Sequence, residues 1–241
     1  VDDGTDLTVV FSEHGGYNLM TADNNSGQGD RFQSLIRFNG IESLIPENAV
    51  IDQALLRFIT GDDTDSRISV HRMLMDWPAK PTWNTFGSEG VEMNDVEAAL
   101  DADDSEFGNI PFAQPVFFDI TKSVKAWVSD PSKNFGHVIV NSGSNGWDTP
   151  QSEFFAVFDA ALVGGTGLLR ARPQLTVYYT IPGDLNNDGS VNRDDLEVIK
   201  NNLRKPVSAC PECDIDGDGR VSILDARKLM MLCTCPRCVC P

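Results

Sequence analysis

The chain has 241 residues, of which 41% are hydrophobic, and it carries a formal net charge of −17 at pH 7. That charge excludes nucleic acids and anionic membranes as natural partners, because binding phosphate groups needs clustered Lys and Arg side chains. The hydrophobic fraction suffices for a folded core, and no apolar run approaches the roughly 20 residues that span a bilayer. No signal peptide begins at Val1, so we expect either a mature secreted form or a cytosolic protein.

Residues 1–181 predict an all-β domain, because their apolar runs are short and turn residues separate them. Within one run, Ala54, Leu56 and Phe58 fall on one face, while Leu55 and Arg57 fall on the other. This alternation is typical of packed antiparallel sheets, and the number of runs favours a mainly β fold, a jelly-roll-like sandwich. The expected strands are Leu7–Phe11, Ser34–Phe38, Ala49–Ile59, Arg67–Met73, Pro115–Ile120, Gly136–Asn141, Glu153–Phe158 and Gln174–Thr180.

One short helix interrupts the strands. We expect it to begin at Thr121, whose hydroxyl can cap it, and to end at Asp130–Pro131. Val124, Trp127 and Val128 would share its buried face, since they follow helical spacing. Two long polar segments are expected to be loops, Thr21–Asp30 and Gly87–Gly108.

The pattern changes after residue 181, so we expect a second, small domain at 182–241. The segments that start at Asp184 and Asp214 form an internal repeat thirty residues apart and agree at five of twelve positions. Side-chain oxygens recur at positions 1, 3, 5, 9 and 12, glycine stands at position 6, and position 7 can offer its carbonyl. Calcium takes six to eight such oxygens, so the repeat predicts two calcium sites. The expected ligands are Asp184, Asn186, Asp188, Ser190, Asn192 and Asp195 in the first site, and Asp214, Asp216, Asp218, Arg220, Ser222 and Asp225 in the second.

Each loop leads into a helix with an apolar stripe. Val191 and Val221, at position 8, are expected to pair the two loops and to point into a small core. Without metal the clustered carboxylates would repel one another, so we expect this domain to be disordered when calcium is absent. The expected apolar stripes are Leu196, Ile199 and Leu203 in one helix, and Ile223, Leu224, Leu229, Met230 and Leu232 in the other.

All six cysteines lie between positions 210 and 240. Disulfides would staple a small domain that has little core of its own, and six cysteines allow fifteen pairings. The spacing is also compatible with zinc or another soft metal, because zinc prefers four such ligands. The cysteines concerned are Cys210, Cys213, Cys233, Cys235, Cys238 and Cys240.

The run GDLNNDGSVNRDDLEVIKNNL, followed by DIDGDGRVSILDARKLMML, resembles a type I dockerin. The resemblance implies a module that binds two calcium ions and docks onto a β-sandwich cohesin, through positions 10 and 11 of the loops. Those positions are Arg193 and Asp194 in the first copy, and Ile223 and Leu224 in the second, so the two copies differ in chemistry. The ending CTCPRCVC departs from the ordinary cellulosomal pattern.

Parts of the first domain resemble the DNRLRE domain, a family of secreted β-sandwiches related to carbohydrate-binding modules. The resemblance covers most of residues 5–180 and implies a sandwich fold. Its members sit beside polysaccharide-degrading enzymes and in surface proteins. The stretches that carry it are Leu35–Phe38, Ile45–Phe58, Asp76–Asn84, Phe118–Trp127 and Arg172–Tyr179.

Few residues of the first domain point to a site. Trp147 lies in the polar segment SGSNGWDTP and is the best candidate for stacking on a sugar ring. The acidic run 103–106 is expected to be a solvated face or a third calcium site rather than a glycosidase pair. Other candidate oxygens for such a site are Asp23, Asp30 and Asp159. The side chains expected only to pack are Trp77, Trp83, Trp127, His14, His71 and His137.

These features favour a secreted or cell-surface, non-catalytic protein whose assembly depends on calcium. The partner would be a cohesin-like β-sandwich or a neighbouring copy of the chain, in which case head-to-tail contacts would build an extracellular fibre for structure or adhesion. The alternative is a polysaccharide-binding module tethered through its dockerin. An enzyme is disfavoured, because no phosphate-binding glycine loop, nucleophile elbow or zinc-hydrolase helix occurs.

Overall fold

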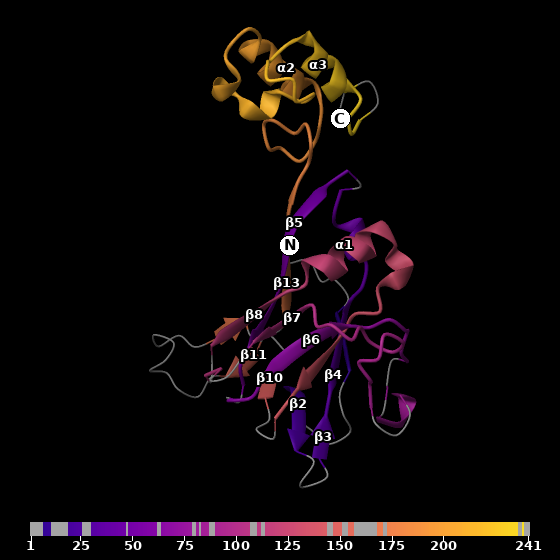
Figure 1. Cartoon of the computed structure of the whole chain (residues 1–241). Coiled ribbons are helices and arrows are strands. Elements are labelled where there is room, and N and C mark those ends of the chain that lie inside the picture. Colours follow the sequence, from indigo (N-terminus) through magenta and orange to yellow (C-terminus); the bar gives the residue numbers. More distant parts are fainter. Residues whose placement is uncertain are drawn as a thin grey trace. The chain divides into compact units, whose positions relative to one another are not determined.

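In a computed structural model the chain forms two compact units (Figure 1). Their residue ranges differ from the single boundary predicted after residue 181. Unit 1 comprises Val1–Ile45 and Gln53–Tyr178, and unit 2 comprises Pro46–Asp52 and Tyr179–Pro241. The residues described are 7–10, 19–25, 30–46, 48–61, 64–78, 81, 83–86, 90–106, 110–111, 114–143, 147–150, 154–156, 168–170, 173–235 and 238. None of the helices within these ranges has the length and apolar character to cross a membrane.

Unit 1 is built mainly from antiparallel strands. Hydrogen-bonded neighbours follow the orders β1-β4-β9-β6-β7, β10-β2-β3, β11-β12 and β13-β5-β8. The strands are β1 (Leu7–Val10), β2 (Leu19–Asn25), β3 (Asp30–Phe32), β4 (Ser34–Phe38), β5 (Val50–Ile59), β6 (Ile68–Arg72), β7 (Asp104–Glu106), β8 (Pro115–Asp119), β9 (His137–Asn141), β10 (Trp147–Pro150), β11 (Phe154–Ala156), β12 (Leu168–Arg170) and β13 (Gln174–Thr180).

Each of the eight predicted strands contains an observed one, and Ser34–Phe38 and Gln174–Thr180 match residue for residue. The two predicted loops are wrong in part. Residues 21–25 belong to β2 and pair with β3 and β10, and residues 104–106 form β7, which pairs with β6. Main-chain hydrogen bonds to the partner strands outweigh the low strand propensity of these polar residues, and two of the pairings, β2 with β10 and β7 with β6, join strands far apart in sequence.

The alternation in β5 is confirmed, since Ala54, Leu56 and Phe58 are completely buried. The ring of Phe58 makes edge-to-face contacts with Phe118 and Trp147, with ring centroids 6.0 and 5.6 Å apart. These aromatic contacts fill the core beneath the β13-β5-β8 sheet.

The sheet β1-β4-β9-β6-β7 is buried on both faces at its centre. Register places Leu35 opposite Val138 on one face and Ile36 opposite His137 on the other, and all four side chains are buried. A second apolar cluster covers the face of Leu35 and Val138, and Trp77 belongs to it. Two-sided burial explains why β4 and β9 contain consecutive apolar residues rather than an alternating pattern.

Helix α1 (Thr121–Ser129) ends just before Asp130, as predicted, but Thr121 does not cap it. Ile120 occupies the N-cap position and makes no side-chain cap bond. Instead Asp119 Oδ1 accepts the N–H of Thr121 at 2.9 Å and its hydroxyl at 2.5 Å. That hydroxyl in turn accepts the N–H of Ala54 at 2.8 Å, so it ties the helix to β5. Val124 and Trp127 are fully buried and Val128 is half-buried.

The described part of unit 2 contains two α-helices, α2 (Arg193–Asn202) and α3 (Ile223–Met230). Their inner faces meet around Val191, Ile199, Val221 and Leu229, which form its core. Residues 46–52 belong to this unit although they precede most of unit 1 in the chain, which the sequence pattern does not indicate. The short 3-10 helices of both units are η1 (Ile41–Ser43), η2 (Trp83–Phe86), η3 (Pro131–Lys133), η4 (Val207–Ala209) and η5 (Pro211–Cys213).

Candidate calcium sites

The second loop gathers three carboxylates. One oxygen each of Asp214, Asp216 and Asp218 lies within 4.8 Å of the others. The turn that brings them together is held by Asp214, whose Oδ1 accepts the N–H of Asp218 at 3.0 Å and whose Oδ2 accepts that of Gly219 at 2.9 Å. Gly219 has a φ of +84° and open space where a Cβ would stand. A glycine is therefore favoured at position 219 because of the left-handed backbone conformation, and not because a larger side chain would clash.

The first loop has the same internal bonds. Asp184 Oδ1 accepts the N–H of Asp188 at 3.1 Å, and its Oδ2 accepts that of Gly189 at 2.9 Å. Gly189 has a φ of +88°. Asn186 lies beside Asp188 and donates to its Oδ2 at 2.8 Å, so an amide replaces the carboxylate found at the same position of the second loop. The first loop therefore carries one formal negative charge fewer at positions 1, 3 and 5.

The carboxylate at position 12 joins each loop to its helix. Asp195 and Asp225 are completely buried at the third residues of α2 and α3, where they form capping boxes with Asn192 and Ser222. Asp195 Oδ1 also accepts the N–H of Leu185 at 2.7 Å, at the start of the loop. From the sequence, Asp195 and Asp225 are predicted only as calcium ligands, and their capping role is missed. The spacings Asn-x-x-Asp and Ser-x-x-Asp resemble a capping box and could have indicated it.

The capping bonds keep Asp225 ionised. Burial raises the pKa of Asp225, but hydrogen bonds from the N–H groups of Ser222 and Asp216 lower it by more, so the pKa lies below its usual value. These bonds measure 2.7 and 3.1 Å. An ionised carboxylate is the form that binds a cation.

The two loops are not paired through position 8 as predicted. Val191 and Val221 do point into the core, which confirms that part of the prediction. However, the backbone N–H and C=O of Val191 both bond Thr234, and the C=O of Val221 accepts the N–H of Arg204. The backbone of position 8 in each loop therefore bonds a segment that follows a helix, and not position 8 of the other loop.

The five cysteines that the structure describes are oxidised. Cys210 bonds Cys213, Cys233 bonds Cys238, and Cys235 is also disulfide-bonded. Zinc binds thiolates rather than disulfides, so the soft-metal alternative is wrong for these five cysteines. Cys240 lies outside the described residues.

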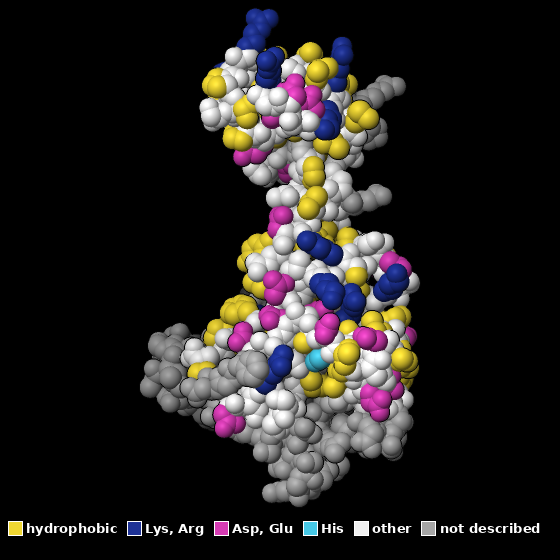
Figure 2. All heavy atoms as spheres, in the orientation of Figure 1, with side chains coloured by type: hydrophobic (Ala, Val, Ile, Leu, Met, Phe, Trp, Pro, Cys, Tyr) yellow, Lys and Arg dark blue, Asp and Glu magenta, His cyan; other side chains and the backbone are white. Residues whose placement is uncertain are grey.

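The proposed docking positions lie on the surface at the first residues of both helices. Arg193 and Asp194 are exposed, and the side chains of Ile223 and Leu224 are 58% and 50% exposed. Figure 2 shows hydrophobic, basic and acidic side chains interspersed on the visible face of this unit. The predicted apolar stripe of α3 is wrong for three of its members, because Met230 is exposed as well, and only Leu229 and Leu232 face inward.

Trp147 is not available to a sugar. It begins β10, is 1% exposed, and packs edge-to-face on Phe58. Its Nε1–H donates to Thr60 Oγ1 at 3.4 Å inside the unit. The polar residues around it in sequence therefore misled the prediction, since strand pairing turns this side chain inward. Trp77 and Trp127 are buried as expected, and the side chain of Trp83 is not described.

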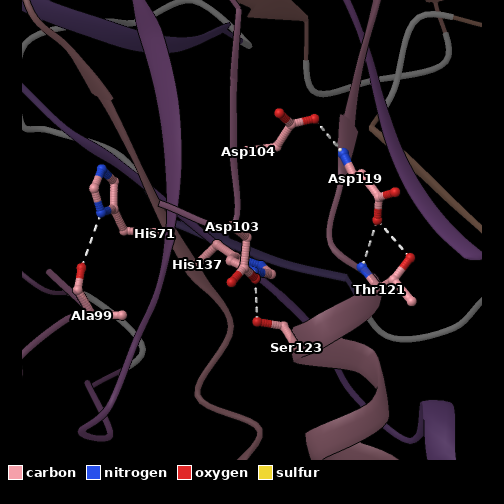
Figure 3. Close-up of polar contacts among 8 residues, drawn as sticks. All are labelled: His71, Ala99, Asp103, Asp104, Asp119, Thr121, Ser123 and His137. Carbon is pink, nitrogen blue, oxygen red and sulfur yellow. Dashed lines mark hydrogen bonds and ion pairs between the residues drawn. The ribbon is translucent and has the colours of Figure 1, made fainter. Parts of the chain in front are cut away.

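His71 and His137, which are expected only to pack, are also hydrogen-bonded (Figure 3). His137 Nε2 donates to Asp103 Oδ2 at 2.9 Å, and the hydroxyl of Ser123 donates to the same oxygen. The side chains of His137 and Asp103 are only 1% and 3% exposed. Asp103 therefore lies in the core, not on the solvated face that its acidic neighbours suggest. Because Ser123 bonds the carboxylate rather than the imidazole, these residues lack the nucleophile-to-base contact of a hydrolase.

Among the residues that the structure describes, the acidic run 103–106 does not gather into a third metal site. Asp104 Oδ2 accepts the N–H of Asp119 at 2.7 Å, which joins β7 to β8. Among the residues described, the only acidic, His or Cys group tight enough to hold a metal is the one in the second loop. The backbones of Asp23 and Asp30 lie in β2 and β3, their side chains are not described, and Asp159 and His14 lie outside the described residues.

Lowering the pH from 7 to 5 is expected to destabilise unit 1 through His71. Burial lowers the pKa of His71 below its ordinary 6.5, and the bond from Nδ1–H to the Ala99 carbonyl, at 2.9 Å, only partly offsets this effect. Nearby Asp103 also raises the pKa, while Arg67 and His137 lower it further.

Because the folded pKa is depressed, the unfolded chain binds more protons below pH 6.5, and stability falls with the pH there. Thermal melts of the wild type and His71→Asn at both pH values test this prediction. We expect a smaller pH effect in the variant, whereas equal effects in both proteins would contradict the assignment to His71.

Two oxygen-lined loops, each entering a helix through a capping box, define a paired loop–helix module for a hard divalent cation. Residues 182–231 match the family model described as the dockerin type I domain. Dockerin domains are non-catalytic modules that bind calcium and dock onto cohesin partners in extracellular or cell-surface proteins. A search of curated proteins found no match to the chain.

Proposed function

We propose that this chain is a calcium-dependent docking protein whose unit 2 binds two calcium ions and then attaches to a protein partner. The observation that carries the proposal is the hydrogen-bond pattern that the two loops share, in which Asp184 and Asp214 accept equivalent backbone N–H groups. The cluster of three carboxylates in the second loop supports it. Oxygen-only ligands suit calcium rather than zinc or copper. The ligands are those predicted at positions 1, 3, 5, 7, 9 and 12, with Ser190 and Arg220 contributing their backbone carbonyls.

Unit 1 acts in this proposal as a non-catalytic β-sandwich of the DNRLRE type with jelly-roll-like topology. The boundary proposed at 181/182 separates the sandwich from the docking module. Residues 46–52 pack with the docking module as part of unit 2. Oxidised cysteines support secretion, because disulfides persist in extracellular compartments. The buried position of Trp147 removes the residue that best supported polysaccharide binding, so calcium-dependent assembly is the better proposal.

The partner is either a cohesin-like β-sandwich or unit 1 of a neighbouring copy of the chain. With a neighbouring copy as the partner, the contacts would run head to tail and form a fibre. The contact surface is the start of the two helices, at Arg193, Asp194, Ile223 and Leu224. Most of the affinity of an interface comes from a few side chains in fully desolvated pockets near its centre. Ile223 and Leu224 can be desolvated at little cost, whereas charged side chains cannot and exposed charged pairs contribute little. We therefore expect the α3 end of the surface to provide most of the affinity.

Replacing Ile223 and Leu224 together by Asp is expected to weaken docking by about 30-fold or more, since hot-spot losses reach about 2 kcal/mol or above. The matched control is Arg193→Ala with Asp194→Ala, which changes the equivalent positions of α2. Binding to a purified type I cohesin and light scattering of the chain alone, each in calcium and in chelator, separate the two kinds of partner.

Calcium uptake by calorimetry shows whether each variant retains its sites. Particle growth in calcium alone, lost in the α3 variant, supports self-assembly, while cohesin binding by a monomer supports the other partner. If neither occurs, or if docking persists in chelator, the proposal is wrong.

A further inference from the structure

The internal repeat extends beyond the two helices. The residues that follow α2 and α3 at the equivalent place are Arg204 and Thr234, thirty positions apart. Each bonds position 8 of the loop that precedes the other helix. The N–H of Arg204 donates to the Val221 carbonyl at 3.4 Å, and the N–H of Thr234 donates to the Val191 carbonyl at 3.1 Å. The segment after each helix therefore holds the loop of the other half of the module, and we call these two contacts braces.

The two braces are not equal. The hydroxyl of Thr234 also accepts the N–H of Val191 at 3.0 Å and lies 3.3 Å from the Val191 carbonyl, to which it can donate. Arg204 has no side-chain acceptor, because a guanidinium only donates. The first loop is thus held at both backbone polar groups of position 8, and the hydroxyl provides a contact that the Arg204 side chain cannot supply to the second loop.

The bond to the Val191 N–H bears on a proposed calcium ligand. That N–H and the carbonyl of Ser190 belong to one peptide group, which is planar and trans. When Thr234 fixes the direction of the N–H, it also fixes the direction of the Ser190 carbonyl on the opposite side of the same plane. The carbonyl of Ser190 is the position-7 ligand of the first site.

Thr234 is itself held by the oxidised tail. It lies between Cys233, which bonds Cys238, and Cys235, which is also in a disulfide. Cys238 is buried. The preceding Leu232 packs where the first loop begins, since a Cβ on Gly183 would lie 3.3 Å from Leu232 Cδ1. Leu232 and Thr234 therefore both lie against the first loop.

We propose that Thr234 is a positioning residue for the first calcium site, and that the flanking disulfides hold it there, so that oxidation of the tail strengthens this site selectively. The inference rests on the calcium sites of the proposed function. In this proposal the C-terminal cysteines do more than stabilise the fold, because their reduction weakens calcium binding at the first site more than at the second.

Calorimetry of the full chain with Ca²⁺ tests the assignment in two backgrounds. Asp214→Ala leaves the first site, and Asp184→Ala leaves the second. Thr234→Val is expected to weaken calcium binding about three- to tenfold in the first background, which is the size of one net hydrogen bond. In the second background it should change the affinity less than twofold.

Thr234→Ser keeps the hydroxyl and is the matched control, which should bind like the parent. Circular dichroism in saturating calcium confirms that each variant is folded. If Thr234→Val binds normally in the first background, weakens both sites equally, or is matched by Thr234→Ser, the positioning role is wrong. A parent chain that takes up no calcium contradicts the proposed function instead.

The role of the disulfide is tested by Cys233→Ser with Cys238→Ser. This double variant should weaken the first site about as much as Thr234→Val and leave the second unchanged. Normal affinity at the first site would show that the disulfide does not hold Thr234 in place, while the role of the hydroxyl would still stand on the valine variant.

Discussion

Chelating calcium is expected to unfold α2 and α3 while the strands of unit 1 persist. Without the cation, the carboxylates of Asp214, Asp216 and Asp218 repel one another within 4.8 Å, and the loops that start both helices lose their shape. The core of unit 2 is small, so it has little stability to set against that repulsion. At free calcium a thousandfold above Kd, one bound ion stabilises the folded unit by about 4 kcal/mol.

Circular dichroism at 222 nm and hydrogen exchange of the oxidised chain, in calcium and in chelator, measure this effect. Fast exchange in α2 and α3 after chelation, with protected amides in β4 and β9, is the expected result. The variant Asp214→Ala should need more calcium for protection, whereas Glu212→Ala, an exposed acid just outside the loop, should behave like the wild type. Helices that remain protected in chelator would show that metal does not fold the unit.

The turns of the two acidic loops could be predicted from sequence because the proposed ligands of each loop lie within twelve consecutive residues. Local spacing then determines which oxygens can meet, and the internal repeat shows the same pattern twice. The bonds of Asp195 and Asp225 at the helix starts are equally local and could have been predicted from the capping spacing. The braces from Arg204 and Thr234 could not, since each depends on how the two helices pack.

Unit 1 shows the opposite case. Its strongest strands follow from short apolar runs, but β2 and β7 are largely polar and each pairs with a strand that is distant in sequence, β2 with β10 and β7 with β6. Trp147 was assigned to a polar surface because its neighbours in sequence are polar, yet its indole reaches Thr60, 87 residues away. Burial of a side chain depends on such long-range contacts, which a single sequence does not reveal.

The buried group around Asp103 is the clearest example. His137 lies 34 residues from Asp103 and Ser123 lies 20 residues from it. Burial raises the pKa of Asp103, but the bonds from His137 and Ser123 lower it by more, to below its ordinary 3.8. Its ionised form therefore stabilises unit 1 above about pH 4, and that stability is lost as the pH falls through the folded pKa.

Replacing Asp103 by Ala is expected to destabilise unit 1 by about 2–5 kcal/mol. The change leaves the Nε2–H of His137 and the hydroxyl of Ser123 without their acceptor, and each buried unsatisfied donor costs about 1–3 kcal/mol. It also disconnects three elements, because Asp103 joins the segment before β7 to β9 and to α1. Urea unfolding followed by tryptophan fluorescence measures the loss, since Trp127 lies against His137 with ring centroids 5.0 Å apart.

The matched control is Asp101→Ala, which removes an exposed carboxylate two residues away and should change stability by no more than about 0.5 kcal/mol. Asp103→Asn keeps the shape and one acceptor oxygen but loses the charge, so its stability should lie between those of the wild type and Asp103→Ala. The wild type should also lose more stability than Asp103→Asn between pH 5 and pH 3, because only the wild type has this carboxylate to protonate. If Asp103→Ala unfolds at the same urea concentration as Asp101→Ala, the buried bonds to His137 and Ser123 contribute nothing net, and this account of the core of unit 1 fails.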